Sequence, residues 1–473
     1  MSGDADGITG LTLSEVADAI AGGTISSVQA TQACLDRIEV LQPRLNCFIQ
    51  VDKENALEAA RRADQVLADG KKVGPLHGVP LAHKDLYYRA GRVSTGGSLI
   101  RKDFVPEYTA TVLERLDAAG AVDLGTLNMC EFAQGPHGLN DHYGHCRNPW
   151  NVEHICGGSS SGSGVSVSAR LAFGSLGTDT GGSVRLPAGM CGLVGLKPTY
   201  GRVSRYGVMP LSFSLDHVGP LTRTVNDCAR MMGGIAGRDE RDPTSATEAT
   251  PDFEAGLESG VKGLKIGVPT NYFYEKTSDE IEQGMEASLD VFRELGAEIL
   301  TVEVPDPREI FELGQVVSRS EVAAIHREWL ATRPQDYSPQ VRARSQQGLA
   351  IPATQYLEAV SLRQNVVADF VAAVFGKVDL LHTPMLSIPV PGIAETDVGA
   401  SERMGEVISA LTWCTRPFNY LGVPVLTMPA GFSDNGLPMS FQLIGRPFAE
   451  PLLLQAGHAY EAETRWHETA PSC

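Results

Sequence analysis

The 473-residue sequence contains no run of about 18 consecutive apolar residues, which a membrane-spanning helix would need. It also lacks a charged N-terminal stretch followed by an apolar one, because Met1 to Gly10 is polar, and such a pair of stretches marks a secretory signal. We therefore predict a cytoplasmic protein that has no membrane partner.

Cysteine pairs of the form Cys-x-x-Cys are also missing, and the nine cysteines are an odd number scattered along a large chain. They are Cys34, Cys47, Cys130, Cys146, Cys156, Cys191, Cys228, Cys414 and Cys473. Disulfide frameworks belong mainly to small secreted domains. The pattern predicts reduced thiols.

Positive charge is scarce, since 39 Lys and Arg face 57 Asp and Glu, which gives a formal net charge of −18. An acidic surface repels the phosphates of nucleic acids and anionic membranes. The balance favours solubility and predicts no nucleic-acid partner.

Internal repeats and low-complexity tracts are absent too, and the apolar fraction of 42% is near that of average soluble proteins. Short apolar segments alternate with amphipathic ones, which indicates an α/β protein. Helices are expected at residues 12–21, 27–41, 55–69, 111–119, 280–295 and 354–375, and strands at 121–124, 261–268, 298–304 and 378–383. The polar stretch 239–250 fits either a linker or an exposed loop inside one domain.

Three segments carry residues suited to catalysis. The first, Gly157 to Gly164 (GGSSSGSG), fits a flexible linker by composition. However, it is short and leads directly into the helix-like segment Val165 to Ala172. A loop that opens a helix points backbone N–H groups at whatever lies there.

The second segment, Leu176 to Pro187 (LGTDTGGSVRLP), is a short apolar strand that breaks into a Gly-Gly turn bearing Ser183. Glycines let the backbone approach a substrate closely and direct several N–H groups at one point, as an oxyanion hole requires. An ordinary turn is the alternative.

The third segment contains Lys84 within Val79 to Leu86 (VPLAHKDL), which is mostly apolar and strand-like. Burial would lower the pKa of this lysine and let its neutral amine act as a base. A solvated surface lysine, or one paired with Asp85, is the alternative.

Taken together, the three segments resemble the amidase signature family. That family has a Gly-Gly-Ser-Ser-Gly-Gly-Ser-like loop, a downstream Gly-Thr-Asp-x-Gly-Gly-Ser-x-Arg turn and an upstream Gly-Val-Pro-x-x-x-Lys-Asp. The resemblance extends from about Leu11 to His467 and is strongest from Gly78 to Pro220. This chain departs from the pattern at Ser161, where the family usually has Gly, and at Gly164, where Ala is common.

The resemblance implies a fold and a mechanism. The expected fold is a single large domain, residues 1–473, with a central mixed, mostly parallel twisted β-sheet covered by helices. Its signature core spans about 76–220, and a variable substrate-loop region spans about 305–350. Ser183 is the expected nucleophile, Ser159 the proton relay and Lys84 the base, with no metal or organic cofactor.

Further site residues follow from the same resemblance. The oxyanion hole is expected from the N–H groups of Thr180, Gly181, Gly182 and Ser183. Asp179 and Arg185 are expected to form a supporting pair. Met129 and Gly135 match a family stretch that lines the pocket and are predicted to bind substrate. The segments 310–348 and 413–420 are expected to set specificity.

The segment from Cys130 to Cys156 is rich in His and Cys, a composition that suggests zinc. The spacing His142-x-x-His145-Cys146 is not a standard ligand pattern, so structural or pocket-lining roles are favoured.

The function favoured by these residues is hydrolysis of the C–N bond of small or aryl amides, and by extension of carbamates or esters, by a stand-alone enzyme. A homodimer is left open by the resemblance. One alternative is the glutaminase A subunit of a tRNA-dependent amidotransferase, because Gly192 to Gly207 resembles that subfamily. Another is an α/β-hydrolase esterase that uses Ser160 in a G-x-S-x-G elbow.

Overall fold

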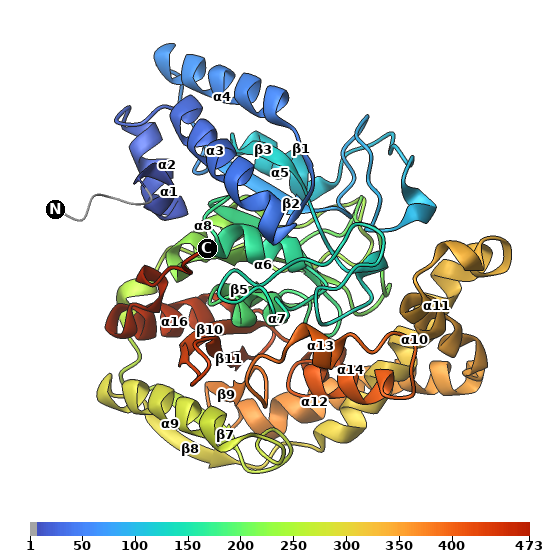
Figure 1. Ribbon diagram of the computed structural model, residues 1–473. Coiled ribbons are helices and arrows are strands. Elements are labelled where there is room, and N and C mark those ends of the chain that lie inside the picture. The colour runs from blue at the N-terminus through green and yellow to red at the C-terminus, as the bar shows by residue number, and fades with distance from the viewer. Residues whose placement is uncertain (1–6) are drawn as a thin grey trace.

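The computed structural model describes residues 7–473, and one continuous sheet of 11 strands crosses it in the order β1-β3-β2-β4-β6-β5-β10-β11-β9-β7-β8. The strands are β1 (Phe48–Val51), β2 (Pro80–Lys84), β3 (Val122–Leu127), β4 (Gly174–Asp179), β5 (Val194–Lys197), β6 (His217–Thr222), β7 (Lys265–Pro269), β8 (Glu298–Val302), β9 (Leu380–Pro384), β10 (Val425–Phe432) and β11 (Pro438–Gly445). Figure 1 shows the sheet running from the N-terminal helices to β8 at the opposite end of the molecule.

The sheet is mixed, and this confirms the predicted α/β class with a large sheet covered by helices. The expectation of mostly parallel strands is wrong, because six of the ten strand pairings are antiparallel. Part of the reason is local: β10 and β11 are joined by a short turn, and only antiparallel neighbours can be connected so briefly. Parallel pairs occur where β2 meets β3 and β4, and where β7 meets β8 and β9.

Helices cover the sheet, and most of those expected from the sequence are present. The first long helices carry the predicted signals: Thr12 and Glu15 form a capping box at the start of α2, and Ser26 with Gln29 forms another before α3. Elements up to residue 294 are α1 (Gly7–Gly10), α2 (Leu13–Ala21), α3 (Ser27–Leu45), α4 (Lys53–Ala68), α5 (Thr111–Ala118), α6 (Ser161–Ser168), α7 (Arg185–Met190), α8 (Val225–Ile235) and α9 (Asp279–Glu294). The polar stretch 239–250 contains turns and bends but no helix or strand.

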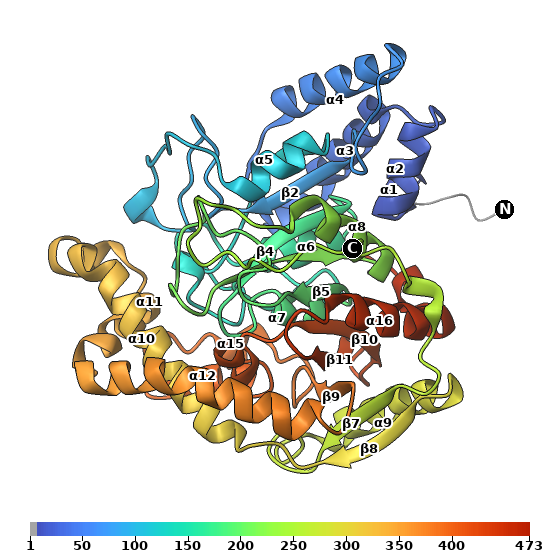
Figure 2. The same cartoon turned by 180° about the vertical axis from the view of Figure 1, so that it is seen from behind.

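The region 305–350, expected to be variable loops, is mostly helical. Later helices are α10 (Pro307–Thr332), α11 (Pro339–Gln347), α12 (Ala353–Phe375), α13 (Ile393–Thr396), α14 (Met404–Thr412), α15 (Pro417–Leu421) and α16 (Glu450–Thr464). The side chain of Asp306 caps α10, and Pro307 takes its first position, where a missing N–H costs nothing. Figures 1 and 2 show α10, α11 and α12 together on one side of the molecule.

Two expectations based on composition can be examined in the structure. All nine cysteines are free thiols, as predicted, and eight of them are buried. Within residues 7–473, no helix combines the length and apolar character needed to cross a bilayer. The polar N-terminal stretch, for which no secretory signal is expected, lies partly outside the described residues, at positions 1–6.

Candidate active site

The site is built where two parallel neighbours, β2 and β4, end at the same edge of the sheet. Ala82 pairs with Ser175 and His83 with Leu176. Lys84, the last residue of β2, therefore lies beside the end of β4, from which Thr178 and Asp179 lead into the Gly-Gly turn.

Lys84 is buried, with 1% of its surface exposed. Its Nζ atom lies 2.7 Å from Ser159 Oγ and 2.9 Å from Thr178 Oγ1. Asp85 instead accepts a hydrogen bond from the backbone N–H of Thr95, at 2.9 Å. Lys84 is thus neither a solvated surface lysine nor the partner of Asp85.

Burial lowers the pKa of Lys84 to about 7, and the charges of Asp216 and Asp179 oppose that shift only in part. A large share of the amine is then neutral near pH 7, which a lysine with an ordinary pKa would not be. The geometry and the pKa allow Lys84 to accept a proton from Ser159.

The Gly/Ser run is not a linker, because residues 157–160 form an ordered loop and Ser161 begins α6. The N–H of Ser160 donates to the carbonyl oxygen of Ser183 at 3.3 Å, which ties this loop to the turn that carries the expected nucleophile. Gly158 has no room for a side chain, since a Cβ there would lie 2.6 Å from the carbonyl oxygen of Gly135.

Ser160 does not fit a nucleophile elbow. It is fully buried, and its Oγ contacts the backbone of Thr178, accepting from N–H at 3.2 Å and donating to C=O at 3.3 Å. No strand leads into it, whereas an elbow requires one. The side chain links the loop to β4.

Asp179 shapes the turn that follows β4. Its carboxylate accepts N–H bonds from Gly182 at 2.8 Å and from Val184 at 3.1 Å. Gly182 has φ +129°, and a Cβ there would lie 2.5 Å from Thr415 Oγ1, so only glycine fits. The turn presents Ser183, which is 9% exposed.

Three of the four N–H groups expected in the oxyanion hole are available for a ligand. The N–H of Gly182 is directed at Asp179. Those of Thr180, Gly181 and Ser183 have no acceptor among the described residues. The Thr180 hydroxyl donates to Asp216 at 2.5 Å, which fixes that end of the turn.

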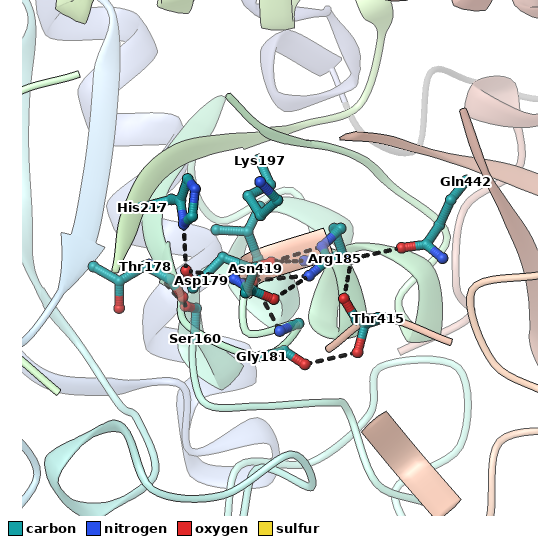
Figure 3. Close-up of polar contacts among 12 residues, drawn as sticks. Ser160, Thr178, Asp179, Gly181, Arg185, Lys197, His217, Thr415, Asn419 and Gln442 are labelled. Atoms are coloured by element: carbon teal, nitrogen blue, oxygen red, sulfur yellow. Dashed lines mark hydrogen bonds and ion pairs between the residues drawn. The ribbon is translucent and has the colours of Figure 1, made fainter. Parts of the chain in front are cut away.

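Asp179 and Arg185, the expected supporting pair, are both fully buried, and Arg185 Nε lies 3.0 Å from Asp179 Oδ2. Burial opposes ionisation of Asp179, but the charge of Arg185 outweighs it and holds the pKa of the carboxyl below its usual value. Arg185 also donates to the Thr415 carbonyl at 2.9 Å and to Gln442 Oε1 at 2.8 Å, and Asn419 donates to Asp179 (Figure 3). The pair therefore connects the turn to β11 and to α15.

A small cavity of about 30 Å³ opens beside Ser183. Gly135, one of the two predicted substrate-binding residues, lines it. Met129 does not: it is fully buried, and its carbonyl accepts from the Asn140 amide at 2.7 Å. The other lining residues are Ala133, Pro136, Thr180, Gly181, Leu186, Leu211, Ser318, Arg344, Ile408, Thr412 and Arg416.

The His- and Cys-rich segment has separate structural contacts. His137 Nε2 lies 3.1 Å from Gln340 Oε1, His154 Nδ1 lies 2.9 Å from the carbonyl oxygen of Val390, and His142 faces Glu131. Across residues 7–473, no three His, Cys, Asp or Glu side chains are grouped as metal ligands.

Several residues around the site were missed from the sequence. Thr178, which contacts Lys84, lies inside the Gly-Thr-Asp motif, so its position was a usable signal. Gln442 and Arg344 lie in the stretches 442–446 and 336–344, which resemble the family but name no ligand, while Asn419 and Arg416 carry no comparable motif. Arg344 and Arg416 do fall within 310–348 and 413–420, the two segments expected to set specificity.

Comparison with known proteins identifies the family of this chain. The model of the family described as Amidase matches residues 29–454. The A subunit of glutamyl-tRNA(Gln) amidotransferase from Geobacter sp. (strain M21) is 39% identical, over 97% of this chain and 98% of that protein.

Among solved structures, peptide amidase from Stenotrophomonas maltophilia has a TM-score of 0.84 at 32% identity, over 96% of this chain and 97% of that chain. A chain from a vestigial complex, described as revealing the origins of an s-triazine catabolic enzyme, has a TM-score of 0.90 at 32% identity, over 98% of this chain and 100% of that one. The protein belongs to the amidase signature family.

Proposed function

We propose that this protein is an amidohydrolase that cleaves the C–N bond of a small amide through an acyl-enzyme on Ser183. The observation that carries the proposal is the buried contact of 2.7 Å between Lys84 Nζ and Ser159 Oγ, in a loop hydrogen-bonded to Ser183. A neutral amine, a relay hydroxyl and a nucleophilic hydroxyl in series are what serine-based acyl transfer needs.

In the proposed mechanism, Lys84 takes the proton of Ser159 as Ser159 takes that of Ser183, and Ser183 Oγ attacks the carbonyl carbon. The N–H groups of Thr180, Gly181 and Ser183 stabilise the oxyanion. The proton returns through Ser159 to the leaving amine as the C–N bond breaks. Water, activated by the same relay, then hydrolyses the ester on Ser183.

Two settings for this chemistry are open. Likeness of sequence favours the glutaminase A subunit of a tRNA-dependent amidotransferase. The relative from Geobacter has the name of such an A subunit, and the two chains align over nearly their whole lengths. Likeness of structure includes an enzyme named as a peptide amidase, which supports a stand-alone hydrolase of amides, and by the same acyl chemistry of carbamates or esters.

A hydrolysis panel separates the two settings. Purified protein is tested on short aliphatic amides, an anilide, an aryl carbamate, an aryl ester and glutamine, with Ser183→Ala as control. Turnover that the purified chain performs alone and that the variant lacks supports a stand-alone amidohydrolase. Glutamine turnover that appears only with added partner proteins supports the amidotransferase setting. Turnover retained by the variant contradicts the mechanism.

A further inference from the structure

The cavity beside Ser183 continues into a second hollow whose walls are cationic. The two share Leu211, Ser318, Arg344, Ile408 and Arg416. The second, of about 50 Å³, adds Arg319 from α10, while Arg344 comes from α11 and Arg416 from the residue before α15. In a chain of net charge −18, three arginines therefore converge next to the expected nucleophile.

Arg416 reaches the turn itself. A Cβ placed on Gly181 would lie 3.6 Å from Arg416 Nη2 and 3.8 Å from Nε. Because the Gly181 N–H is one of the expected oxyanion donors, an acyl group held at that turn would extend past the guanidinium of Arg416.

Arg344 and Arg416 have unused hydrogen-bond donors and no close carboxylate. The buried Nε of Arg416 and the buried Nη1 of Arg344 have no hydrogen-bond partner, and neither side chain has an ion pair among the described residues. Neither hollow has an Asp or Glu in its lining. The carboxylate of Glu312, which is exposed on α10, is outside both linings and lies 3.4 Å from the Gln315 amide.

Burial lowers the pKa of Arg416 to about 9, and the neighbouring charges of Arg344 and Arg319 add to that shift, which Glu312 opposes only in part. Burial likewise lowers the pKa of Arg344 to about 10. Like charges held together in a closed space favour an anion that would sit between them.

Arg363, which lies on α12 and lines neither hollow, offers a contrast. Its guanidinium donates to the backbone carbonyls of Tyr420 at 2.6 Å and Ser214 at 2.7 Å, so its donors are used by the fold. The guanidinium of Arg344 has no hydrogen bond to any described residue.

We propose that the substrate is an amide bearing a carboxylate, bound by Arg344 and Arg416, with no ammonium group nearby. The inference rests on the proposed acyl-enzyme chemistry and narrows its substrate class. A carboxylate can receive paired N–H bonds from guanidinium groups. A free α-ammonium would find no carboxylate to receive it and would face three like charges.

Three amides of equal chain length test this: glutaramate, glutamine, which adds an α-ammonium, and pentanamide, which replaces the carboxylate by a methyl group. We expect kcat/KM for glutaramate to exceed those for the other two by at least about tenfold. Arg344→Gln should lower the glutaramate value by about tenfold or more and leave pentanamide within about threefold. Arg342→Gln, an exposed residue on the same helix, is the matched control and should change neither.

A labelling experiment covers the case in which none of these amides is large enough to be turned over. The rate at which a fluorophosphonate labels Ser183 is measured with and without glutarate. Glutarate should slow labelling of the wild type and of Arg342→Gln, but not of Arg344→Gln.

The outcomes separate the inference from the proposed function. Equal turnover of glutaramate and pentanamide, preference for glutamine, or labelling that glutarate leaves unchanged would overturn the inference while keeping the acyl-enzyme chemistry. Failure of Ser183 to be labelled at all would overturn the proposed function, and the inference with it.

Discussion

The turn after β4 and the cavity wall from α10, α11 and α15 meet at Ser183. They differ in that the charged side chains of the turn are paired and those of the wall are not. In the turn, Asp179 and Arg185 are fully buried, paired at 3.0 Å and further bonded to Asn419 and Gln442. In the wall, Arg344 and Arg416 form no ion pair with a described residue, and each has a buried N–H group without a partner.

This difference distinguishes charged side chains that support the fold from those that can bind a ligand. A buried charge that is fully hydrogen-bonded fixes a backbone shape, and breaking its pair is costly. A buried donor without a partner costs free energy in the empty protein, a cost that a bound anion would remove. The same residue type thus serves the fold at Arg185 and, by our proposal, the ligand at Arg344.

The largest expected effect is that of Ser183→Ala on activity. Removing the nucleophile should lower kcat by about 10⁴-fold or more, because attack by water would have to replace the acyl-enzyme route. Initial-rate measurements on the best substrate in the panel check this. Circular dichroism should show an unchanged fold, and a variant with more than a few per cent of wild-type turnover would rule Ser183 out.

The next effect concerns stability and the turn. Asp179→Asn keeps the shape of the side chain but leaves Arg185 buried without its counter-charge, which should cost about 3–5 kcal/mol of the free energy of unfolding. Urea denaturation measures the loss. Asp290→Asn, which breaks an exposed pair with Arg293, serves as control and should cost less than about 1 kcal/mol. Equal losses would mean that the buried pair does not support the fold.

A third prediction uses the pKa of Lys84, which burial lowers to about 7. The base must be neutral, so kcat/KM for a neutral amide should fall about tenfold per unit as pH decreases below about 7, and should level off above it. A pH–rate profile with pentanamide measures this, since that substrate does not titrate in the range. A profile that stays flat from pH 8 to pH 5.5 would show that Lys84 is not the base.

The smallest effect is expected at the wall. Arg344→Gln removes one of several mutually repelling cations and breaks no hydrogen bond to a described residue, so the free energy of unfolding should stay equal or rise slightly. Arg363→Gln should lose about 1–3 kcal/mol, because it leaves backbone carbonyls without donors. If urea denaturation showed similar losses in the free energy of unfolding for both variants, Arg344 would support the fold as Arg363 does, and the comparison would fail.

Much of the site could be predicted because its requirements are local in sequence. Gly182 needs a positive φ, Asp179 must reach N–H groups within six residues, and Ser159 must lie in a loop of small residues. Each of these constraints acts on residues close together in the chain, so it is visible as a short sequence motif. The class of the fold followed from alternating strand and helix patterns, and those patterns also gave the approximate bounds of α2, α3, α4 and α9.

What escaped prediction depends on contacts distant in sequence. Arg344 and Arg416 are separated by 72 positions and meet only because α11 and α15 both pack against α10. Strands β10 and β11 are buried in the sheet and lack the alternation that marks a half-exposed strand. The segment that forms helix α10 was expected to be loop because the family resemblance implied variable substrate loops there. Polar residues buried in this helix, among them Glu321 and His326, interrupt its apolar pattern.

Trapping the acyl-enzyme tests the central claim most directly. Wild-type protein is acid-quenched during turnover of a slowly hydrolysed aryl ester or amide, and its intact mass and peptide map are measured. The account predicts one added acyl group, located on Ser183, that is absent in Ser183→Ala and forms much more slowly in Lys84→Met. An acyl group on Ser160 or Ser159, or one still formed by Ser183→Ala, would contradict it.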